Sequence, residues 1–588
     1  MLDINKLPHI SELPNIETNF KIFAGPGAGK TTWLIRHLKK VLEKSERLGK
    51  TKKIACITYT NVAAEEILNR LDCDKSRFSI STIHSFLYLN IVKPFSYLIT
   101  KDNEGEKLFE INNLDGHEEH IPDNDIIRRW KTTIENLNHK NYNYFNFTGN
   151  KKKLIAQLSN IDYSFIDDDI DLIFRKIFGL RIPKSNGELW IYKKKYWHAG
   201  IMHHEDVLYF SYLIINKSPR VLEFVRNKFP YIFIDEFQDT TELQTWIIKK
   251  IAESETIVGV IGDLAQSIYS FTGAKRSDFK NLVLKNVQSY KLDKNHRSTR
   301  SIINFLNHLR TDITQEITEK TAEGDSVKLL VGSHSNILSW IKKEGFQNTY
   351  ILTRKNETVE EIKNQIVLSG SNLLEKLYLM DSNSSRVKVL HSILMGFKFY
   401  MKGYFKDARK EVVRPLKIRA GKLVSKLELN SIAIKIIDDL KKEENVQKDL
   451  FNYYMKLLDN LYGRFKFRVG SKITKTCKVK TFYESTSVAD LLKYIKVDTK
   501  SEDTIRTIHS AKGTEFDNTL VYFEKIQDFK KYVFDCTNYL NSDEDDARIY
   551  YVGFSRAKRN LFISSPKIDE DVISGINKLN IEHCDCSK

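Results

Sequence analysis

FKIFAGPGAGKTTWLIRHLKKVL, at residues 20–42, combines three signals that together determine the fold class of this chain. Residues 20–24 form an apolar run that predicts a strand, residues 25–29 predict a glycine-rich turn, and an amphipathic helix is expected from Lys30 onward. Glycines allow successive backbone N–H groups to converge on phosphate oxygens, and the start of the helix adds a partial positive charge. The stretch therefore predicts a phosphate-binding loop between a strand and a helix.

The side chains of this loop indicate what it binds. Lys30 is expected to reach the β- and γ-phosphates of ATP, and the hydroxyl of Thr31 is expected to ligate Mg²⁺. Ala24 occupies the first glycine position of the strict pattern, a replacement that many phosphate-binding loops accept. The residues expected to bind ATP in this loop are Gly25, Gly27, Ala28, Gly29, Lys30, Thr31 and Thr32.

A second apolar run ends in two carboxylates. YIFID at residues 231–235 predicts a buried strand that ends at Asp235, and Glu236 follows it. Asp235 is expected to hold Mg²⁺ through water, and Glu236 to orient and deprotonate the attacking water. An isolated Asp-Glu pair is typical of a surface turn, but the apolar strand before it and the phosphate-binding loop elsewhere in the chain favour a hydrolytic site.

Composition and charge exclude several classes of protein. Lys+Arg 93 against Asp+Glu 76 gives a net charge of +17, which favours polyanionic partners such as nucleic acid. A hydrophobic fraction of 41% excludes a mainly disordered chain. No run approaches the roughly 18 apolar residues of a membrane span, and the first residues lack the pattern of a signal peptide. We therefore expect a cytoplasmic protein without a membrane partner.

Most of the chain alternates short β-rich runs with helices, which predicts α/β domains with parallel sheets. Two stretches differ from the rest of the chain in amino-acid composition. Residues 91–200 are rich in Asn, Tyr, Asp and Lys, and residues 371–499 are Lys-rich and helical. Residues 391–430 hold 10 Lys+Arg against 3 Asp+Glu, a pattern that fits a solvated helical face and a nucleic-acid contact equally well.

Nine sequence blocks resemble, in type and in order, those of superfamily 1A DNA helicases of the UvrD/Rep/PcrA type. They are GPGAGKTT (25–32), ITYTNVAAEEILNRL (57–71), STIHSF (81–86), DEFQDTTELQ (235–244), GDLAQSIYSFTGA (262–274), LDKNHRST (292–299), ILTRKN (351–356), TIHSAKGTEFD (507–517) and ARIYYVGFSRAKRNLFI (547–563). The blocks span residues 25–563, whereas the stretches between them match the family much less well.

This resemblance implies two RecA-like P-loop domains with ATP between them. Each domain is expected to be a parallel sheet flanked by helices, interrupted by a mainly helical insertion. The expected divisions are 1–90 with 201–278 for domain 1A, 91–200 for insertion 1B, 279–370 with 500–588 for domain 2A, and 371–499 for insertion 2B.

The resemblance also assigns roles to residues outside the phosphate-binding loop. Gln266 is expected to sense the γ-phosphate, and Glu515 to contact the ribose. Arg297 and Arg556 resemble the two arginines that the second domain points at the γ-phosphate. A preorganised guanidinium offsets charge that develops in the transition state, an effect of about 10³–10⁵ in rate for arginine fingers. The expected catalytic set is Glu236, Gln266, Arg297 and Arg556, whereas Glu515 is expected to bind ATP.

For single-stranded DNA the resemblance points to Tyr59, His84, Phe271 and His509. Aromatic faces stack bases without sequence preference, while basic groups follow the phosphates. A core position is the alternative for Tyr59.

Two clusters resemble metal sites without fitting one. His203, His204, Glu205 and Asp206 are consecutive, and four consecutive residues cannot converge on one tetrahedral zinc ion. The tail that contains His583, Cys584 and Cys586 is expected to be a loose terminus.

The chain departs from the family pattern at the nucleotide base and at one arginine. The family has a glutamine that reads adenine upstream of the phosphate-binding loop, but the first glutamine here is Gln157. His296 stands where an aromatic residue, usually Tyr, stacks on the base, so the choice among ATP, dATP and GTP stays open. Thr272 replaces an arginine that is expected to couple ATP to DNA.

We therefore expect an ATP-dependent 3′→5′ single-stranded-DNA translocase and DNA helicase. Its cofactors are ATP and Mg²⁺, and its partners are single-stranded DNA and 3′-tailed duplex DNA; the polarity follows from the resemblance alone. The size and the departures resemble those of the compact helicase subunit of Gabija-type anti-phage systems. The alternative is thus a DNA-sensing NTPase switch that regulates a partner nuclease in phage defence with little unwinding. An RNA helicase is a third possibility.

Overall fold

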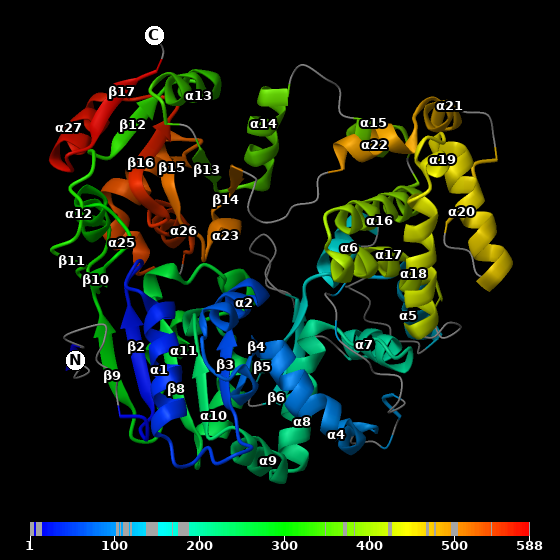
Figure 1. The fold of residues 1–588 in the computed structure, drawn as a ribbon, viewed down its shortest axis with the longest axis horizontal. Coiled ribbons are helices and arrows are strands. Elements are labelled where there is room, and N and C mark those ends of the chain that lie inside the picture. Colours follow the sequence, from blue (N-terminus) through cyan, green and yellow to red (C-terminus); the bar gives the residue numbers. More distant parts are fainter. Residues whose placement is uncertain are drawn as a thin grey trace. The chain divides into compact units, whose positions relative to one another are not determined.

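The computed structural model forms two compact units, one of residues 1–362 with 504–588 and one of residues 363–503 (Figure 1). The residues that it describes are 5–6, 15–101, 105, 107–109, 117, 120, 122–136, 151–166, 169–174, 187–346, 348–367, 373–381, 383–420, 426–465, 470–474, 478–495, 504–542 and 544–586.

The first unit contains two parallel sheets, of which the first is built around the phosphate-binding loop. Its strand order is β1 (Asn5–Lys6), β9 (Gln288–Leu292), β2 (Phe20–Ala24), β8 (Ile257–Gly262), β7 (Tyr231–Ile234), β3 (Ile54–Thr58) and β4 (Phe78–Thr82). Every pair in this sheet is parallel. Strands β2, β8 and β7 are therefore neighbours whose carboxyl ends meet at one edge, which is where ligands bind in open α/β sheets.

Side chains alternate between the two faces of this sheet, as the pleat of a strand requires. In β7, Tyr231 and Phe233 pack with Trp33, whereas Ile232 and Ile234 pack on the opposite face. Helices α1 (Lys30–Lys44) and α2 (Asn61–Arg70) cover the first face. The helices that contribute to the other core are α3 (Ile83–Leu87), α8 (His204–Lys217), α9 (Arg220–Lys228), α10 (Glu242–Ala252) and α11 (Arg276–Lys280).

The first insertion shares the second of these cores. It contains α4 (Lys93–Phe95), α5 (Asn124–Asn136), α6 (Lys151–Leu158), the antiparallel hairpin β5 (Ile161–Ile166) and β6 (Asp169–Phe174), and α7 (Glu188–His198). Trp130, Ile134 and Trp197 of this insertion are buried in the same cluster as Ile232 and Val258 of the sheet. The insertion therefore packs as part of the first domain.

The second sheet of this unit is parallel throughout. Its strand order is β14 (Ile505–Thr507), β13 (Thr349–Thr353), β15 (Phe516–Tyr522), β16 (Ala557–Ser565), β12 (Lys328–Val331) and β17 (Glu582–Asp585). Helices α13 (His334–Lys343) and α14 (Asn356–Val367) supply the core of one face. The other face packs against α12 (Arg300–Leu309), α23 (Ile508–Ala511), α24 (Ile526–Phe529), α25 (Cys536–Leu540), α26 (Asp546–Phe554) and α27 (Glu570–Lys578). A two-residue parallel pair joins β10 (Lys294–Asn295) to β11 (Glu316–Ile317).

The second unit is helical in its described residues. Its helices are α15 (Leu373–Met380), α16 (Ser384–Met401), α17 (Phe405–Ala420), α18 (Lys426–Leu440), α19 (Glu443–Val446), α20 (Leu450–Phe465), α21 (Lys478–Ser485) and α22 (Val488–Tyr494). They enclose one apolar core. In its polar part, Arg386 donates to Asp381 through Nε at 2.6 Å and Nη2 at 2.7 Å, and the Tyr483 hydroxyl donates to Asp381 at 2.8 Å.

The expected fold class, two RecA-like parallel sheets flanked by helices, is confirmed. Two expectations from the sequence are wrong. Strand β9 pairs with β2 in the first sheet, so the first domain continues beyond residue 278, to Leu292. The tail with His583, Cys584 and Cys586 is not loose, because β17 pairs with β12 and Cys586 is buried. None of the helices in the described ranges is both long and apolar enough to cross a lipid bilayer.

Candidate functional site

The loop after β2 has the backbone geometry that a phosphate requires. Gly27 and Gly29 have φ of +71° and +75°, in the left-handed region that favours glycine, and α1 begins directly after Gly29. A Cβ atom at Gly27 would lie 2.5 Å from Asn295 Oδ1 and 2.8 Å from Arg297 Cβ. Gln315 supports the loop from behind, where its Nε2 donates to the carbonyl of Pro26 at 3.1 Å. The loop is therefore fixed both by its own conformation and by the chain beyond β9.

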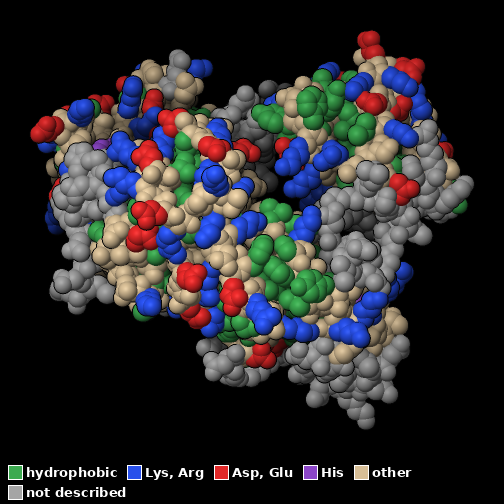
Figure 2. All heavy atoms as spheres, turned by 60° about the horizontal axis from the view of Figure 1, so that its bottom comes forward, with side chains coloured by type: hydrophobic (Ala, Val, Ile, Leu, Met, Phe, Trp, Pro, Cys, Tyr) green, Lys and Arg blue, Asp and Glu red, His purple; other side chains and the backbone are tan. Residues whose placement is uncertain are grey.

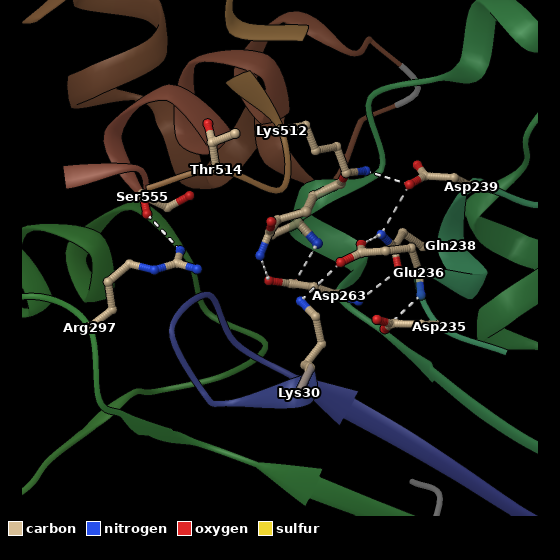
Figure 3. Close-up of polar contacts among 12 residues, drawn as sticks. Lys30, Asp235, Glu236, Gln238, Asp239, Asp263, Arg297, Lys512, Thr514 and Ser555 are labelled. Carbon is tan, nitrogen blue, oxygen red and sulfur yellow. Dashed lines mark hydrogen bonds and ion pairs between the residues drawn. The ribbon is translucent and has the colours of Figure 1, made fainter. Parts of the chain in front are cut away.

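The two acidic residues expected at the end of β7 lie beside this loop. Lys30 Nζ is 3.6 Å from Glu236 Oε1 (Figure 3). Glu236 has φ of +55°, a conformation that costs a non-glycine residue free energy and is concentrated at functional sites. Its backbone N–H donates to Asp235 Oδ1 at 2.9 Å, and Gln238 Nε2 donates to Glu236 Oε2 at 2.5 Å. The carboxylate of Glu236 is thus held by Lys30 and Gln238 together.

Burial and neighbouring charges separate the pKa values of these two acids. Burial, together with the adjacent Glu236, raises the pKa of Asp235 to about 7. Burial alone would also raise the pKa of Glu236, but Lys30 and then Lys512 hold it at about 2. Because burial and Glu236 disfavour the ionised form of Asp235, a further positive charge beside it would stabilise its carboxylate. Thr31 and Asp235 offer a hydroxyl and a carboxylate, the hard oxygen donors that suit Mg²⁺.

Gln266 follows β8, the strand between β2 and β7. Its Nε2 donates to Asp263 Oδ2 at 2.7 Å, and its Oε1 accepts from Arg556 Nη2 at 3.0 Å. Arg556 is buried and also donates to the carbonyls of Val552 and Thr514. Burial and then Arg297 lower the pKa of Arg556 to about 9, so the guanidinium remains charged at neutral pH. One expected arginine of the second domain therefore meets the expected γ-phosphate sensor of the first.

The second expected arginine lies next to the first. Arg297 Nη1 donates to the Ser555 carbonyl at 3.0 Å (Figure 3). Its Nε donates to Glu515 Oε2 at 2.7 Å. Glu515, which was expected to contact the ribose, is paired with this arginine in the structure. The exposed His296 donates its backbone N–H to the carbonyl of Gly27 at 2.9 Å, which places it beside the phosphate-binding loop.

Three of the four residues expected to contact DNA lie in one aromatic cluster. Tyr59 stacks on Tyr269 with ring centroids 4.7 Å apart and an interplanar angle of 22°. The ring centroid of Phe271 lies 5.8 Å from that of Tyr269 and 5.6 Å from that of His509. Tyr59 and Phe271 are 40% and 54% exposed, which excludes the core alternative for Tyr59. Burial and then Arg354 lower the pKa of His509 to about 4, so His509 contributes a neutral ring.

His84 is not part of this cluster. Its ring lies 5.5 Å from that of His204 and 6.4 Å from that of His117, in the first insertion and α8. Basic side chains are likewise not confined to the aromatic cluster: Figure 2 shows Lys and Arg distributed over much of one face, with Asp and Glu among them.

The acidic and histidine residues at the start of α8 surround a buried lysine. His120, His203 and Glu205 bring potential ligand atoms within 4.8 Å of one another. The fully buried Lys193 Nζ lies among them, 2.9 Å from Glu205 Oε1 and 3.2 Å from His203 Nδ1, and 2.7 Å from Asp206 Oδ1. An ammonium therefore lies among these potential ligand atoms and pairs with both carboxylates.

Sequence reasoning missed several residues that the structure brings into the site. Lys512 donates to Asp239 and to the carbonyl of Gln266, the latter at 2.6 Å, and its Nζ lies 4.9 Å from the Tyr269 ring centroid. The quoted blocks contain Gln238, Tyr269 and Lys512, so the resemblance could have pointed to these three residues. Arg310 carries no such signal, because it lies outside the blocks, directly after α12.

Comparisons with known proteins agree with this geometry. The chain matches the UvrD/REP helicase N-terminal domain over residues 10–288 and the UvrD-like helicase C-terminal domain over residues 472–567. It is 25% identical to the Gabija protein GajB of Bacillus cereus, over 92% of this chain and 91% of that protein. It is 22% identical to the ATP-dependent DNA helicase PcrA of Bacillus subtilis, over 93% of this chain and 80% of that protein. A probable DNA helicase II homolog of Mycoplasma genitalium is 24% identical, over 92% and 82%.

The phosphate-binding loop should not tolerate a side chain at Gly27. Gly27→Ala imposes a left-handed alanine, which costs about 1–2 kcal/mol, and drives its Cβ against Asn295. We expect the Kd for a fluorescent ATP analogue to rise at least about tenfold, measured by equilibrium titration. Gly345→Ala is the control, because Gly345 has φ of +79° but open space around its Cβ direction. Equal affinities of the two variants would contradict the prediction.

Proposed function

Because the chain belongs to the UvrD/REP family of ATP-dependent DNA helicases, we propose that it moves 3′→5′ along single-stranded DNA and separates strands, driven by ATP hydrolysis between its two RecA-like domains. The observation that supports this best is the contact between Arg556 and Gln266, at 3.0 Å. It joins the second domain to the first beside Lys30 and Glu236, so that the groups needed for hydrolysis come from both domains.

Hydrolysis requires each of these residues to do a different task. Lys30 and the loop N–H groups bind the phosphates, and Gln266 senses the γ-phosphate. Glu236, ionised and held by Gln238, orients the attacking water. Arg297 and Arg556 stabilise charge that develops on the γ-phosphate. Mg²⁺, held by Thr31 and by Asp235 through water, would supply further charge neutralisation.

The same residues offer a path from nucleotide to DNA. Only five positions separate Gln266 from Phe271, so the γ-phosphate sensor and the aromatic cluster belong to one short segment. Lys512 contacts this segment twice, at the carbonyl of Gln266 and over the ring of Tyr269. A change in how the two domains close on ATP therefore moves the stacking surface, which is what translocation needs.

Removal of the proposed water-orienting carboxylate should abolish turnover while leaving nucleotide binding intact. Glu236→Gln keeps the size of the side chain and one acceptor oxygen but removes its charge. We expect DNA-stimulated ATP hydrolysis to fall by about 10²–10⁴, and Lys30→Ala to lose hydrolysis as well. The exposed Glu253, paired only with Lys250 in the described contacts, provides the control Glu253→Gln. Retained hydrolysis in Glu236→Gln would exclude the assignment.

The aromatic cluster should carry much of the affinity for single-stranded DNA. Stacking of one base is worth about 1–3 kcal/mol, so Tyr59→Ala is expected to raise the Kd for an oligonucleotide by about 5- to 150-fold. Fluorescence anisotropy at fixed salt would measure this. Tyr97→Ala is the matched control, because Tyr97 is 55% exposed and lies outside the cluster. A comparable loss in both variants would show that stacking at Tyr59 is not the cause.

A second candidate function is a DNA-sensing NTPase that regulates a partner nuclease in phage defence with little unwinding. The length match to the Gabija protein GajB favours it. Thr272 also favours it, because its hydroxyl only closes a local turn on the Tyr269 carbonyl at 2.8 Å where the family pattern has a cation. Strand displacement on a 3′-tailed duplex, by this chain alone, should distinguish the two. We expect ATP-dependent displacement; DNA-stimulated hydrolysis without displacement would favour the switch.

A further inference from the structure

Asp263 is fully buried at the carboxyl end of β8, in the centre of the proposed hydrolytic site. Its Oδ1 accepts the backbone N–H of Ala265 at 3.0 Å, and its Oδ2 accepts Nε2 of Gln266 at 2.7 Å. A glutamine amide has a donor end and an acceptor end. Because Asp263 takes the donor end of Gln266, the acceptor end faces Arg556. The orientation of the γ-phosphate sensor therefore depends on the carboxylate of Asp263.

The partner of this carboxylate comes from the other RecA-like domain. Arg310 follows α12, whose apolar residues belong to the core of the second sheet, and its side chain is fully buried. Its Nη2 donates to Asp263 Oδ1 at 3.1 Å, and its Nη1 to Asp263 Oδ2 at 3.4 Å. Both oxygens of Asp263 are thus gripped by one planar guanidinium, a geometry that fixes direction as well as charge.

Arg310 is itself rigidly held. Its Nε and Nη2 each donate to Asp312 at 2.8 Å, and its Nη1 donates to the Tyr551 hydroxyl at 3.2 Å. The guanidinium carbon also lies 5.4 Å from the centroid of the Tyr551 ring. Tyr551 belongs to α26, four residues before the helix-terminal segment that carries Ser555 and Arg556. The guanidinium of Arg310 therefore contacts the same helix that Arg556 follows.

We propose that Arg310 is a positioning residue for ATP hydrolysis, which seats Asp263 and through it orients Gln266 toward Arg556. The inference rests on the proposed ATPase function and goes beyond it by naming the contact through which the second domain sets the γ-phosphate sensor. Arg310 itself does not touch the reacting atoms. Its guanidinium links the position of the second domain to the orientation of Gln266, so that hydrolysis proceeds only when the second domain contacts the first.

The test needs a variant that keeps the buried charge, because complete removal would leave Asp263 unpaired and endanger folding. Arg310→Lys retains a cation but loses the fork. We expect kcat for DNA-stimulated ATP hydrolysis to fall at least about tenfold, with KM for ATP within about twofold of wild type. The chain offers a closely matched control in Arg386→Lys. Arg386 also grips an aspartate, Asp381, with two guanidinium nitrogens beside a tyrosine hydroxyl, but in the second unit.

A double-mutant cycle separates positioning from general stability. If Arg310 acts through Gln266, Arg310→Lys should change kcat by less than about twofold in a Gln266→Ala background. Effects of the two substitutions that multiply would overturn the proposal, as would a kcat for Arg310→Lys equal to that of Arg386→Lys. Thermal unfolding of each variant confirms that folded protein is compared. Absence of hydrolysis by the wild-type chain would instead overturn the proposed function, and is distinguishable because no variant is needed to see it.

Discussion

Buried carboxylates at the carboxyl edge of the first sheet impose the pairing of the two RecA-like domains. Asp239 and Asp263 are both buried, and their cationic partners Lys512 and Arg310 come from the second domain. A buried charge without a partner is strongly unfavourable. The second domain therefore supplies the charges that compensate these buried acids, in addition to its proposed catalytic groups.

The proposed nucleotide and DNA sites share one segment of the chain. Residues 263–271 leave β8, contribute Ala265 and Ile268 to the core of the second domain, and end at the exposed Phe271. Along this path the segment passes from a fully buried carboxylate to an exposed ring. A displacement of the second domain acts on the whole segment, because apolar packing and ion pairs hold it together. The geometry is thus suited to convert a change at the phosphates into a change at the stacking surface.

The sequence predicted the groups whose positions follow from local structure. Lys30, Asp235 and Gln266 each lie at a fixed distance from the end of a strand, so a motif and an apolar run are enough to place them at one edge of a parallel sheet. The expectation that Arg556 and Gln266 both approach the γ-phosphate required the family resemblance, since 290 residues separate them.

What the sequence did not reveal depends on tertiary packing. Arg310 contacts Asp263, 47 residues away in the sequence, and Tyr551, 241 residues away. No local sequence pattern predicts either contact. Strand β9 was misplaced because its polar, half-exposed residues lack the apolar texture of its neighbours. His84 lies with His117 and His204 instead of with Tyr59, because α3 packs against α8, the helix that begins with His204.

The strand order of the second sheet also bears on how the chain is made. Strands β12 and β13 are synthesised by residue 353, yet their partners β14, β15, β16 and β17 all lie beyond residue 504. While the ribosome makes the intervening helical unit, two apolar strands wait with unpaired edges. Such edges are prone to intermolecular pairing. Biosynthesis of this chain therefore includes a long interval in which both strands lack their partners, and a nascent chain that stalls within that interval exposes two unpaired, aggregation-prone strands.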